Sequence, residues 1–170
     1  MNERTLFIDI PIDFEYQDKK NGPVKRVNRP LPWQSMRTGR TGGKWKPKRI
    51  LAYYAHLKSE VLAGLPLGWV PIEGPVSVGV VKFYFPRPRY HYSNKKGQKH
   101  IVKAQYEDIY WMSKTPDIDN LLKPLWDSLE GIIFVNDCQI VNYDSLSKAY
   151  ITDTRECKEN GYIMLAMSEL

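Results

Sequence analysis

Two aspartates, Asp117 and Asp119, stand one residue apart in "TPDIDNLLKPLWDSLEG", directly before an amphipathic run. In an extended segment residues i and i+2 point to the same side, so both carboxylates would project together. Like charges at this spacing repel each other unless a cation lies between them or one carboxyl group is protonated. The structural alternative is that Asp119 only caps a helix beginning at Asn120, with Asp117 as a turn residue after Pro116. On the doublet alone, this alternative is favoured.

The residues after the doublet change that balance. Lys123 lies four residues beyond Asp119, and Asp127 lies four beyond Lys123, so all three fall along one face of a helix predicted over 120–130. Leu122, Leu125, Trp126 and Leu129 define the apolar face. Lys123 can therefore reach back towards the doublet, and the ordinary alternative is a surface salt bridge with Asp127.

A third carboxylate is predicted to join the doublet. A helix over 120–130 advances about 16 Å, Gly131 reverses the chain, and a strand over 132–136 returns about as far. This geometry predicts that Asp137 arrives beside the N-terminus of the helix. Three carboxylates and a lysine at one place suit Mg²⁺ or Mn²⁺, which prefer oxygen ligands, and hence phosphodiester hydrolysis.

The positive charge of the chain is segregated in the sequence. The formal net charge is +6, yet residues 19–49 contain eleven Lys/Arg and residues 87–103 contain six, with no acid in either segment. Trp33, Trp45 and Tyr90 are interleaved with these bases, as in proteins that stack bases on aromatic rings and neutralise phosphates with Lys/Arg. Solvated loops rich in Gly and Pro are the alternative explanation, at about even odds from composition alone.

Composition bounds the class of protein. With 170 residues, 42% of them hydrophobic, the chain is expected to form a single domain over 1–170. No apolar run approaches the roughly 18 residues that cross a bilayer, and residues 1–14 do not have the pattern of a signal peptide. Cys138 and Cys157 show no paired-motif spacing and are interpreted as reduced thiols. We expect a soluble protein in the cytoplasm of a bacterial or phage-infected cell, with no membrane partner.

The hydrophobic periodicity predicts an α+β fold, a small mixed sheet with two main helices packed on one face. Strands are expected in "TLFIDIPI" and over 74–85, a helix over 47–63, and apolar runs in "IIFV", "QIVNYDSLSKAYI" and "GYIMLAM". "TDTRECKEN" is interpreted as the turn before the last run. Basic loop insertions are expected at about 17–46 and 86–114.

The stretch "DIDNLLKPLWDSLEGIIFVNDCQIV" closely resembles the signature of the RusA family of Holliday junction resolvases. The signature combines a D-x-D-N doublet, a lysine four residues after the second aspartate, and an aspartate followed by x-Q-[IV]-V. The resemblance is strongest over 115–151, where its several parts make it far more specific than Asp-x-Asp. Asn136 departs from it, since many members have a second acid beside the Asp137 position, and Pro124 would distort the start of the predicted helix.

The resemblance implies a Mg²⁺-dependent, homodimeric endonuclease that makes paired symmetric nicks in four-way or branched DNA during recombination and repair, with Mn²⁺ as a substitute ion. Asp117, Asp119 and Asp137 would be the metal ligands and Lys123 the essential lysine, these four forming the catalytic set. Asn120 and Asp127 would support that set by hydrogen bonds. The residues expected to bind DNA are basic residues in the two insertions or directly after the first one: Arg37, Arg40, Lys44, Lys46, Lys48, Arg87, Arg89, Lys95 and Lys96.

The same residues are compatible with two other functions. A nucleic-acid-binding module with structural or inactive carboxylates fits the basic segments equally well. A nucleotidyltransferase would also use Asp-x-Asp with a distal aspartate. The sequence has no Gly-rich phosphate cradle near the doublet, so this hypothesis ranks well below the other two.

Overall fold

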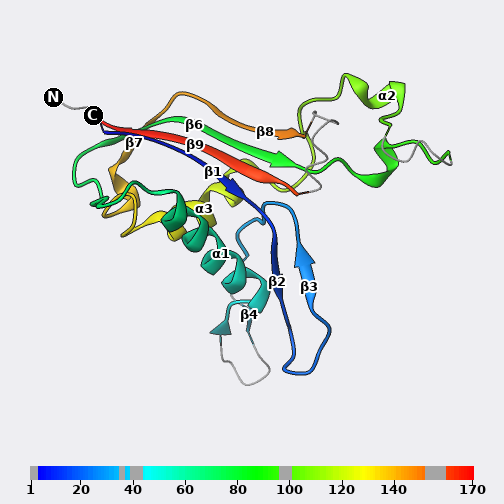
Figure 1. Cartoon of the computed structure of the whole chain (residues 1–170), viewed down its shortest axis with the longest axis horizontal. Coiled ribbons are helices and arrows are strands. Elements are labelled where there is room, and N and C mark those ends of the chain that lie inside the picture. Colours follow the sequence, from blue (N-terminus) through cyan, green and yellow to red (C-terminus); the bar gives the residue numbers. More distant parts are fainter. Residues whose placement is uncertain (1–3, 35–36, 39–43, 96–100, 152–159) are drawn as a thin grey trace.

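A mixed β-sheet with helices on one face forms the body of the protein (Figure 1). A computed structural model describes residues 4–34, 37–38, 44–95, 101–151 and 160–170. The main sheet has the order β1-β9-β6-β7, and β8 also pairs with β6. Its strands are β1 (Thr5–Pro11), β6 (Val76–Phe85), β7 (Ile140–Tyr143), β8 (Leu146–Tyr150) and β9 (Tyr162–Glu169). The predicted α+β fold is confirmed.

Alternation along the strands creates the core. In β1, Leu6, Ile8 and Ile10 are buried while their neighbours are exposed, as the period of two requires. β9 pairs antiparallel with both β1 and β6, so it lies in the interior of the sheet, as β6 does. The predicted strands "TLFIDIPI" and "GYIMLAM" are therefore observed as neighbours, although they lie at opposite ends of the sequence.

Two helices cover one face of this sheet, α1 (Lys48–Gly64) and α3 (Ile118–Leu129) (Figure 1). α1 buries Ile50, Tyr53, Leu57 and Val61, which lie at helical spacing. The buried face of α3 includes leucines that join the same core as the strands. The predicted helix over 47–63 and the prediction of two helices on one face are confirmed.

The segment after α3 differs from the predicted helix–strand return. Residues 131–133 form a turn, and Phe134 makes only isolated bridges to Ile72 and Glu130, so "IIFV" is not a strand. The prediction failed because Ile133 and Phe134 are buried to close the end of the core, a role that apolar residues fill without extended pairing. β7 and β8 then follow one another along a single edge of β6, both parallel to it.

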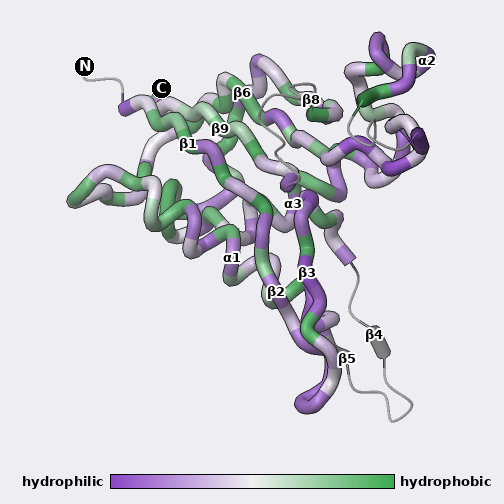
Figure 2. Tube along the Cα trace, turned by 45° about the vertical axis from the view of Figure 1, so that its right-hand side comes forward, coloured by the Kyte–Doolittle hydropathy of each residue, from purple (hydrophilic) through white to green (hydrophobic). Residues whose placement is uncertain are grey.

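The two predicted basic loops contain regular structure. The first holds the hairpin β2 (Phe14–Tyr16) and β3 (Lys25–Val27), which projects from the sheet with a hydrophilic tip (Figure 2), and the short pair β4 (Arg37–Thr38) and β5 (Lys44–Trp45). The second forms a lobe beyond the end of β6, with the 3-10 helix η1 (Arg89–His91) and the short helix α2 (Ala104–Glu107) (Figure 1). The predicted turn "TDTRECKEN" lies at 152–160, and all but its last residue is outside the described residues.

Among the described residues, no helix has the length and apolar character required to cross a membrane.

Gly161 joins the first insertion to the sheet. Its N–H donates to the carbonyl oxygen of Asn28 at 2.6 Å, and its own carbonyl accepts from the N–H of Ile12 at 2.8 Å. A Cβ atom at this position would lie 2.5 Å from the carbonyl oxygen of Tyr84 and 2.9 Å from Cδ of Pro30. Position 161 therefore has no room for a side chain between the first insertion and β6.

We expect Gly161→Ala to lower the free energy of unfolding by about 1 to 3 kcal/mol, because backbone has to move to relieve the contact. Chemical denaturation measures the change. Gly79→Ala is the matched control, since its Cβ would lie 3.8 Å from the nearest atom and should change stability by less than about 1 kcal/mol. Equal effects of the two substitutions would contradict the close packing at Gly161.

Candidate functional site

The aspartate doublet lies across the beginning of α3. Asp117 is the N-cap residue, with extended backbone, and Asp119 lies within the first helical turn. The prediction that the helix begins at Asn120 with Asp119 as its cap is therefore wrong by two residues. The prediction that both aspartates lie in one extended segment is also wrong, because Asp119 is already helical. Asp117 makes no side-chain capping hydrogen bond.

Both carboxylates are exposed to solvent. In the described part of the chain, neither one forms a side-chain hydrogen bond or an ion pair. The two carboxylates lie at the N-terminal end of α3, where the helix dipole attracts negative charge. The doublet therefore supplies exposed oxygen donors that the fold does not use for capping.

The loop before Asp117 is held in place by the ammonium group of Lys148. Nζ of Lys148, on β8, donates to the carbonyl oxygens of Lys114 at 2.6 Å and Pro116 at 2.5 Å. The peptide bond between Thr115 and Pro116 is cis. Because one ammonium group of β8 holds two carbonyl groups of this loop, the position of Asp117 is set by the sheet as well as by the helix.

Pro124 lies inside α3, which continues through it to Leu129. Proline has no N–H, so the carbonyl of Asn120, one turn earlier, loses its intrahelical donor. The backbone N–H of Trp33 donates to that carbonyl at 2.5 Å. The first insertion is thus hydrogen-bonded directly to the turn of α3 that carries the doublet, and the helix does not start later, as Pro124 had suggested.

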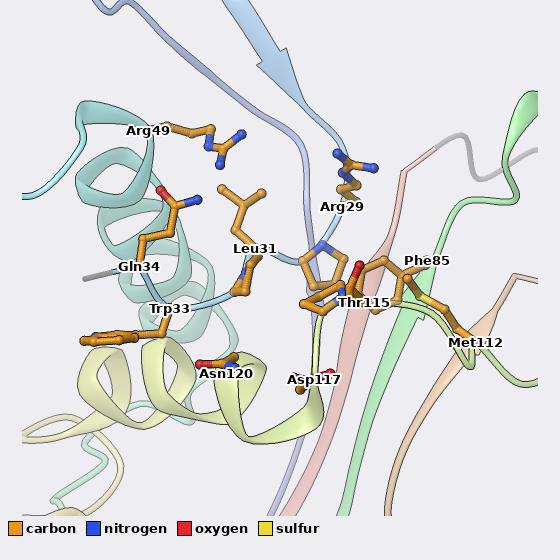
Figure 3. A pocket seen from close by; sticks show the side chains of 13 residues that line it. Arg29, Leu31, Trp33, Gln34, Arg49, Phe85, Met112, Thr115, Asp117 and Asn120 are labelled. Atoms are coloured by element: carbon orange, nitrogen blue, oxygen red, sulfur yellow. The ribbon is translucent and has the colours of Figure 1, made fainter. Parts of the chain in front are cut away.

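This docking encloses a cleft of about 790 Å³ beside Asp117 (Figure 3). Its lining comes from the segment 29–34, from the beginning of α1, from the end of β6 and from the loop that precedes α3. Arg29 and Arg49 line it together with Asp117 and Asn120. In the view of Figure 3 the two guanidinium groups lie on one side of the cleft and Asp117 on the other.

Asp137 lies beyond the opposite end of α3, in the 3-10 helix η2 (Asp137–Gln139). Asn136 caps this short helix, since its Oδ1 accepts from the N–H of Cys138 at 3.0 Å, while Oε1 of Gln139 accepts from the N–H of Asn136 at 2.7 Å. Nε2 of Gln139 also donates to the carbonyl oxygens of Ile72 and Gly74. The glutamine of the x-Q-[IV]-V signature therefore holds the turn that exposes Asp137.

The three carboxylates do not meet at one end of the helix. Nδ2 of Asn136 donates to Glu130, the C-cap residue of α3, at 3.1 Å, so the turn carrying Asp137 is tied to the C-terminal end. Asp119 lies about 16 Å away along the axis at 1.5 Å per residue. Within the described residues, no group of three or more His, Cys, Asp or Glu side chains could hold a metal ion. The predicted convergence in one chain is wrong, because no strand over 132–136 brings the chain back.

Lys123 and Asp127 form the ordinary i,i+4 pair. Nζ of Lys123 lies 4.0 Å from the carboxylate of Asp127, and its side chain is 54% exposed. Asp127 also accepts a hydrogen bond at 3.1 Å from the hydroxyl of Tyr54 on α1. Asp127 therefore joins the two helices, and Lys123, weakly paired, keeps its charge in solvent one turn from Asp119.

The residues predicted to bind DNA divide into three groups. Lys48, Arg89 and Lys95 are exposed, and Lys46 lies over the ring of Tyr54 at 4.7 Å. Arg87 is buried and donates to the carbonyl oxygens of Tyr106 and Ile151, so its prediction as an exposed phosphate ligand is wrong. The side chains of the other predicted DNA-binding residues lie outside the described part of the structure: Arg37, Arg40, Lys44 and Lys96.

Several residues that shape the site were not singled out from the sequence. Arg29 and Arg49 belong to a long run of bases in which nothing marks them as neighbours of Asp117. Lys148 carries no local signal, because its two acceptors are backbone atoms distant in sequence. Gln139 was visible as part of the signature, but its capping role required the structure.

The fold is a mixed sheet with helices on one face. Its candidate site combines two exposed carboxylates at the start of α3 with an adjoining cleft that two arginines line. The model of the family Endodeoxyribonuclease RusA matches residues 27–155, and this protein belongs to that family. The chain is also 33% identical over 84 residues to the "Uncharacterized protein YqaN" of Bacillus subtilis (strain 168). That similarity covers 49% of this chain and 55% of the relative, so the chain spans about half the length of the relative it matches.

The contact between α1 and α3 makes a prediction about pH. Burial and the neighbouring charge of Asp127 raise the pKa of Tyr54 to about 12. Between pH 10 and 12 the folded protein therefore keeps a proton that an unfolded tyrosine has lost, so stability falls as the pH rises through this window. Asp127→Asn removes the charge, should lower the pKa of Tyr54 and should make that fall smaller.

Nuclear magnetic resonance of ring-labelled tyrosine, assigned with Tyr54→Phe, measures this pKa. Glu60→Gln is the control, because it removes a carboxylate from α1 that does not contact Tyr54. An unchanged Tyr54 pKa in Asp127→Asn would refute the contact.

Proposed function

We propose that this protein is a divalent-metal-dependent endodeoxyribonuclease that resolves four-way DNA junctions by hydrolysing phosphodiester bonds, in recombination and repair. The observation that carries the proposal is the pair of exposed carboxylates at the start of α3, within the RusA signature, which have no side-chain partner among the described residues. Mg²⁺ is the proposed ion, with Mn²⁺ as a substitute, because both prefer carboxylate and water oxygens.

The donor set of one chain fits part of such a site. Asp117 and Asp119 supply two hard oxygen ligands, and Mg²⁺ commonly binds through one or two carboxylates while water and phosphate complete its shell. A bound ion there would act as a Lewis acid towards the scissile phosphate and the attacking water. Lys123, exposed on the next turn, would stabilise the extra negative charge of the five-coordinate transition state.

Asn120 has a double role in this proposal. Its carbonyl receives the N–H of Trp33, and its residue lines the cleft beside Asp117. Its side-chain amide would hold a ligand carboxylate or a phosphate oxygen by hydrogen bonding. Lys48, Arg89 and Lys95 would bind phosphates further from the cleavage position.

A homodimer would complete the carboxylate set. We infer that the protein acts as a two-fold symmetric dimer, because a four-way junction is cut in pairs and because Asp137 lies at the opposite end of α3 from Asp117 and Asp119. In an antiparallel arrangement of two α3 helices, each Asp137 would approach the doublet of the other protomer. One chain alone would then bind DNA without cutting it, which is the behaviour of the alternative, non-catalytic module.

Purified protein should nick a four-way junction with Mg²⁺ or Mn²⁺ and leave it intact with Ca²⁺ or EDTA. Asp119→Asn should lower the cleavage rate at least about 100-fold, since several kcal/mol of transition-state stabilisation depend on the ligand. Binding of the junction should be unchanged or tighter, because the substitution removes a charge that repels phosphate. Gel assays measure both quantities.

Asp9→Asn is the matched control for this substitution, as it removes an exposed aspartate from the outer face of β1. A folded wild-type protein that binds the junction but never nicks it with either ion would establish the non-catalytic module instead.

Mixed dimers test whether Asp137 acts across the dimer. In a heterodimer of Asp119→Asn with Asp137→Asn, sharing across the two-fold axis leaves one site with all its carboxylates, whereas sharing within a chain leaves none. We expect two inactive variants to regain about a quarter of the wild-type nicking rate when refolded together, as half of the dimers formed at random would carry one of two sites. Inactivity of the mixture, with heterodimers verified by mass spectrometry, would place the ligands within one chain.

A further inference from the structure

The cleft beside Asp117 has walls of two chemical kinds. Leu31 and Phe85 are buried residues whose surfaces line it, and Trp33 contributes a half-buried indole. Arg29 and Arg49 line the same space. A flat apolar group with an attached anion matches this combination better than either an anion or a hydrocarbon alone.

The two arginines are available to a ligand. Within the described residues, neither Arg29 nor Arg49 forms an ion pair with a carboxylate, whereas Arg26, nearby in sequence, is bonded to Asp13. Arg29 is exposed and Arg49 is half-buried at the beginning of α1. Figure 3 shows both guanidinium groups on the side of the cleft away from Asp117, so an anion bound by them would avoid the negative charge of that aspartate.

The position of Trp33 is fixed by the fold. Its N–H donates to the carbonyl of Asn120, and the preceding Leu31 is buried in the core. The backbone at Trp33 is therefore attached to the first part of α3, and its indole lines the same cleft as Asn120 and Asp117. A docked backbone restricts the positions open to the indole, which lowers the entropic cost of stacking another ring on it.

We propose that this cleft binds one unstacked deoxynucleotide of the strand being cut, with its base against Trp33 and its phosphate between Arg29 and Arg49. The inference rests on the proposed function, because the cleft adjoins Asp117. A base within a stacked duplex has both faces covered by its neighbours and cannot stack on Trp33, so the cleft would select DNA whose strand is already unpaired or is easily opened at the branch point.

Photocross-linking tests the location of the nucleotide. Four-way junctions carry a single 5-iododeoxyuridine at successive positions around the crossover, and Ca²⁺ keeps them uncut. We expect one position to cross-link to Trp33, identified by mass spectrometry of the adduct. Cross-links at every position that form only with other residues would overturn the proposal.

Binding to junctions with one abasic nucleotide tests the stacking. Trp33→Ala should weaken binding of the intact junction about tenfold, as expected for one stacked base. An abasic site at the cross-linking position should weaken binding by the wild-type protein about as much. Trp33→Ala should then bind the abasic junction as tightly as the wild type binds it. Trp33→Phe should restore most of the affinity, and Trp111→Ala, which removes an exposed tryptophan outside the cleft, should leave it unchanged. Additive losses from Trp33→Ala and the abasic site would overturn the proposal.

Arg49→Gln provides a variant that leaves the docked segment 29–34 intact. It should weaken binding of the intact junction and lower the salt dependence of binding by about one phosphate contact. If the protein cleaves junctions normally but does not cross-link through Trp33, the nucleotide site is contradicted and the proposed function is not. A cross-link to Trp33 without cleavage by any metal contradicts the proposed function and leaves the nucleotide site standing.

Discussion

The hydrogen bond from the N–H of Trp33 to the carbonyl of Asn120 is the interaction on which the site depends. Pro124 removes the intrahelical donor for that carbonyl, and an unpartnered, half-buried carbonyl would cost free energy. The first insertion supplies the missing donor and thereby packs against α3. This docking brings the segment 29–34, with Arg29, to the cleft that Asp117 and Arg49 also line.

The two ends of α3 have opposite chemistry. At its beginning, Asp117 and Asp119 have no side-chain partner in the part of the chain that the structure describes, and the loop before them is held by Lys148. At its end, Asn136 and Gln139 satisfy the backbone of the turn that exposes Asp137. A helix of this length keeps the two sets of carboxylates of one chain apart, which is why the proposed site draws Asp137 from a second protomer.

Helices and strands with a strong hydrophobic period could be predicted from the sequence. The prediction of secondary structure failed where apolar residues showed burial but no period. The helix over 47–63, the first and last strands and the strand ending at Phe85 were all predictable, since alternating or helical spacing reveals which face is buried. "IIFV" reads as a strand because it is apolar, yet it closes the end of the core as a turn. Arg87 was taken for a DNA ligand from its surroundings in sequence, but it is buried against backbone carbonyls.

The sequence by itself determined the residue types of the site and the family to which they belong, because a multi-part signature is a property of order along the chain. Only the tertiary structure decided which of these residues are neighbours. Asp137 is separated from the doublet by the length of α3, while Arg29, Trp33 and Arg49 are brought to it from the other half of the chain. The physical reason is that backbone groups such as the Asn120 carbonyl choose their partners by geometry and unmet hydrogen bonding, which leave no trace in local residue spacing.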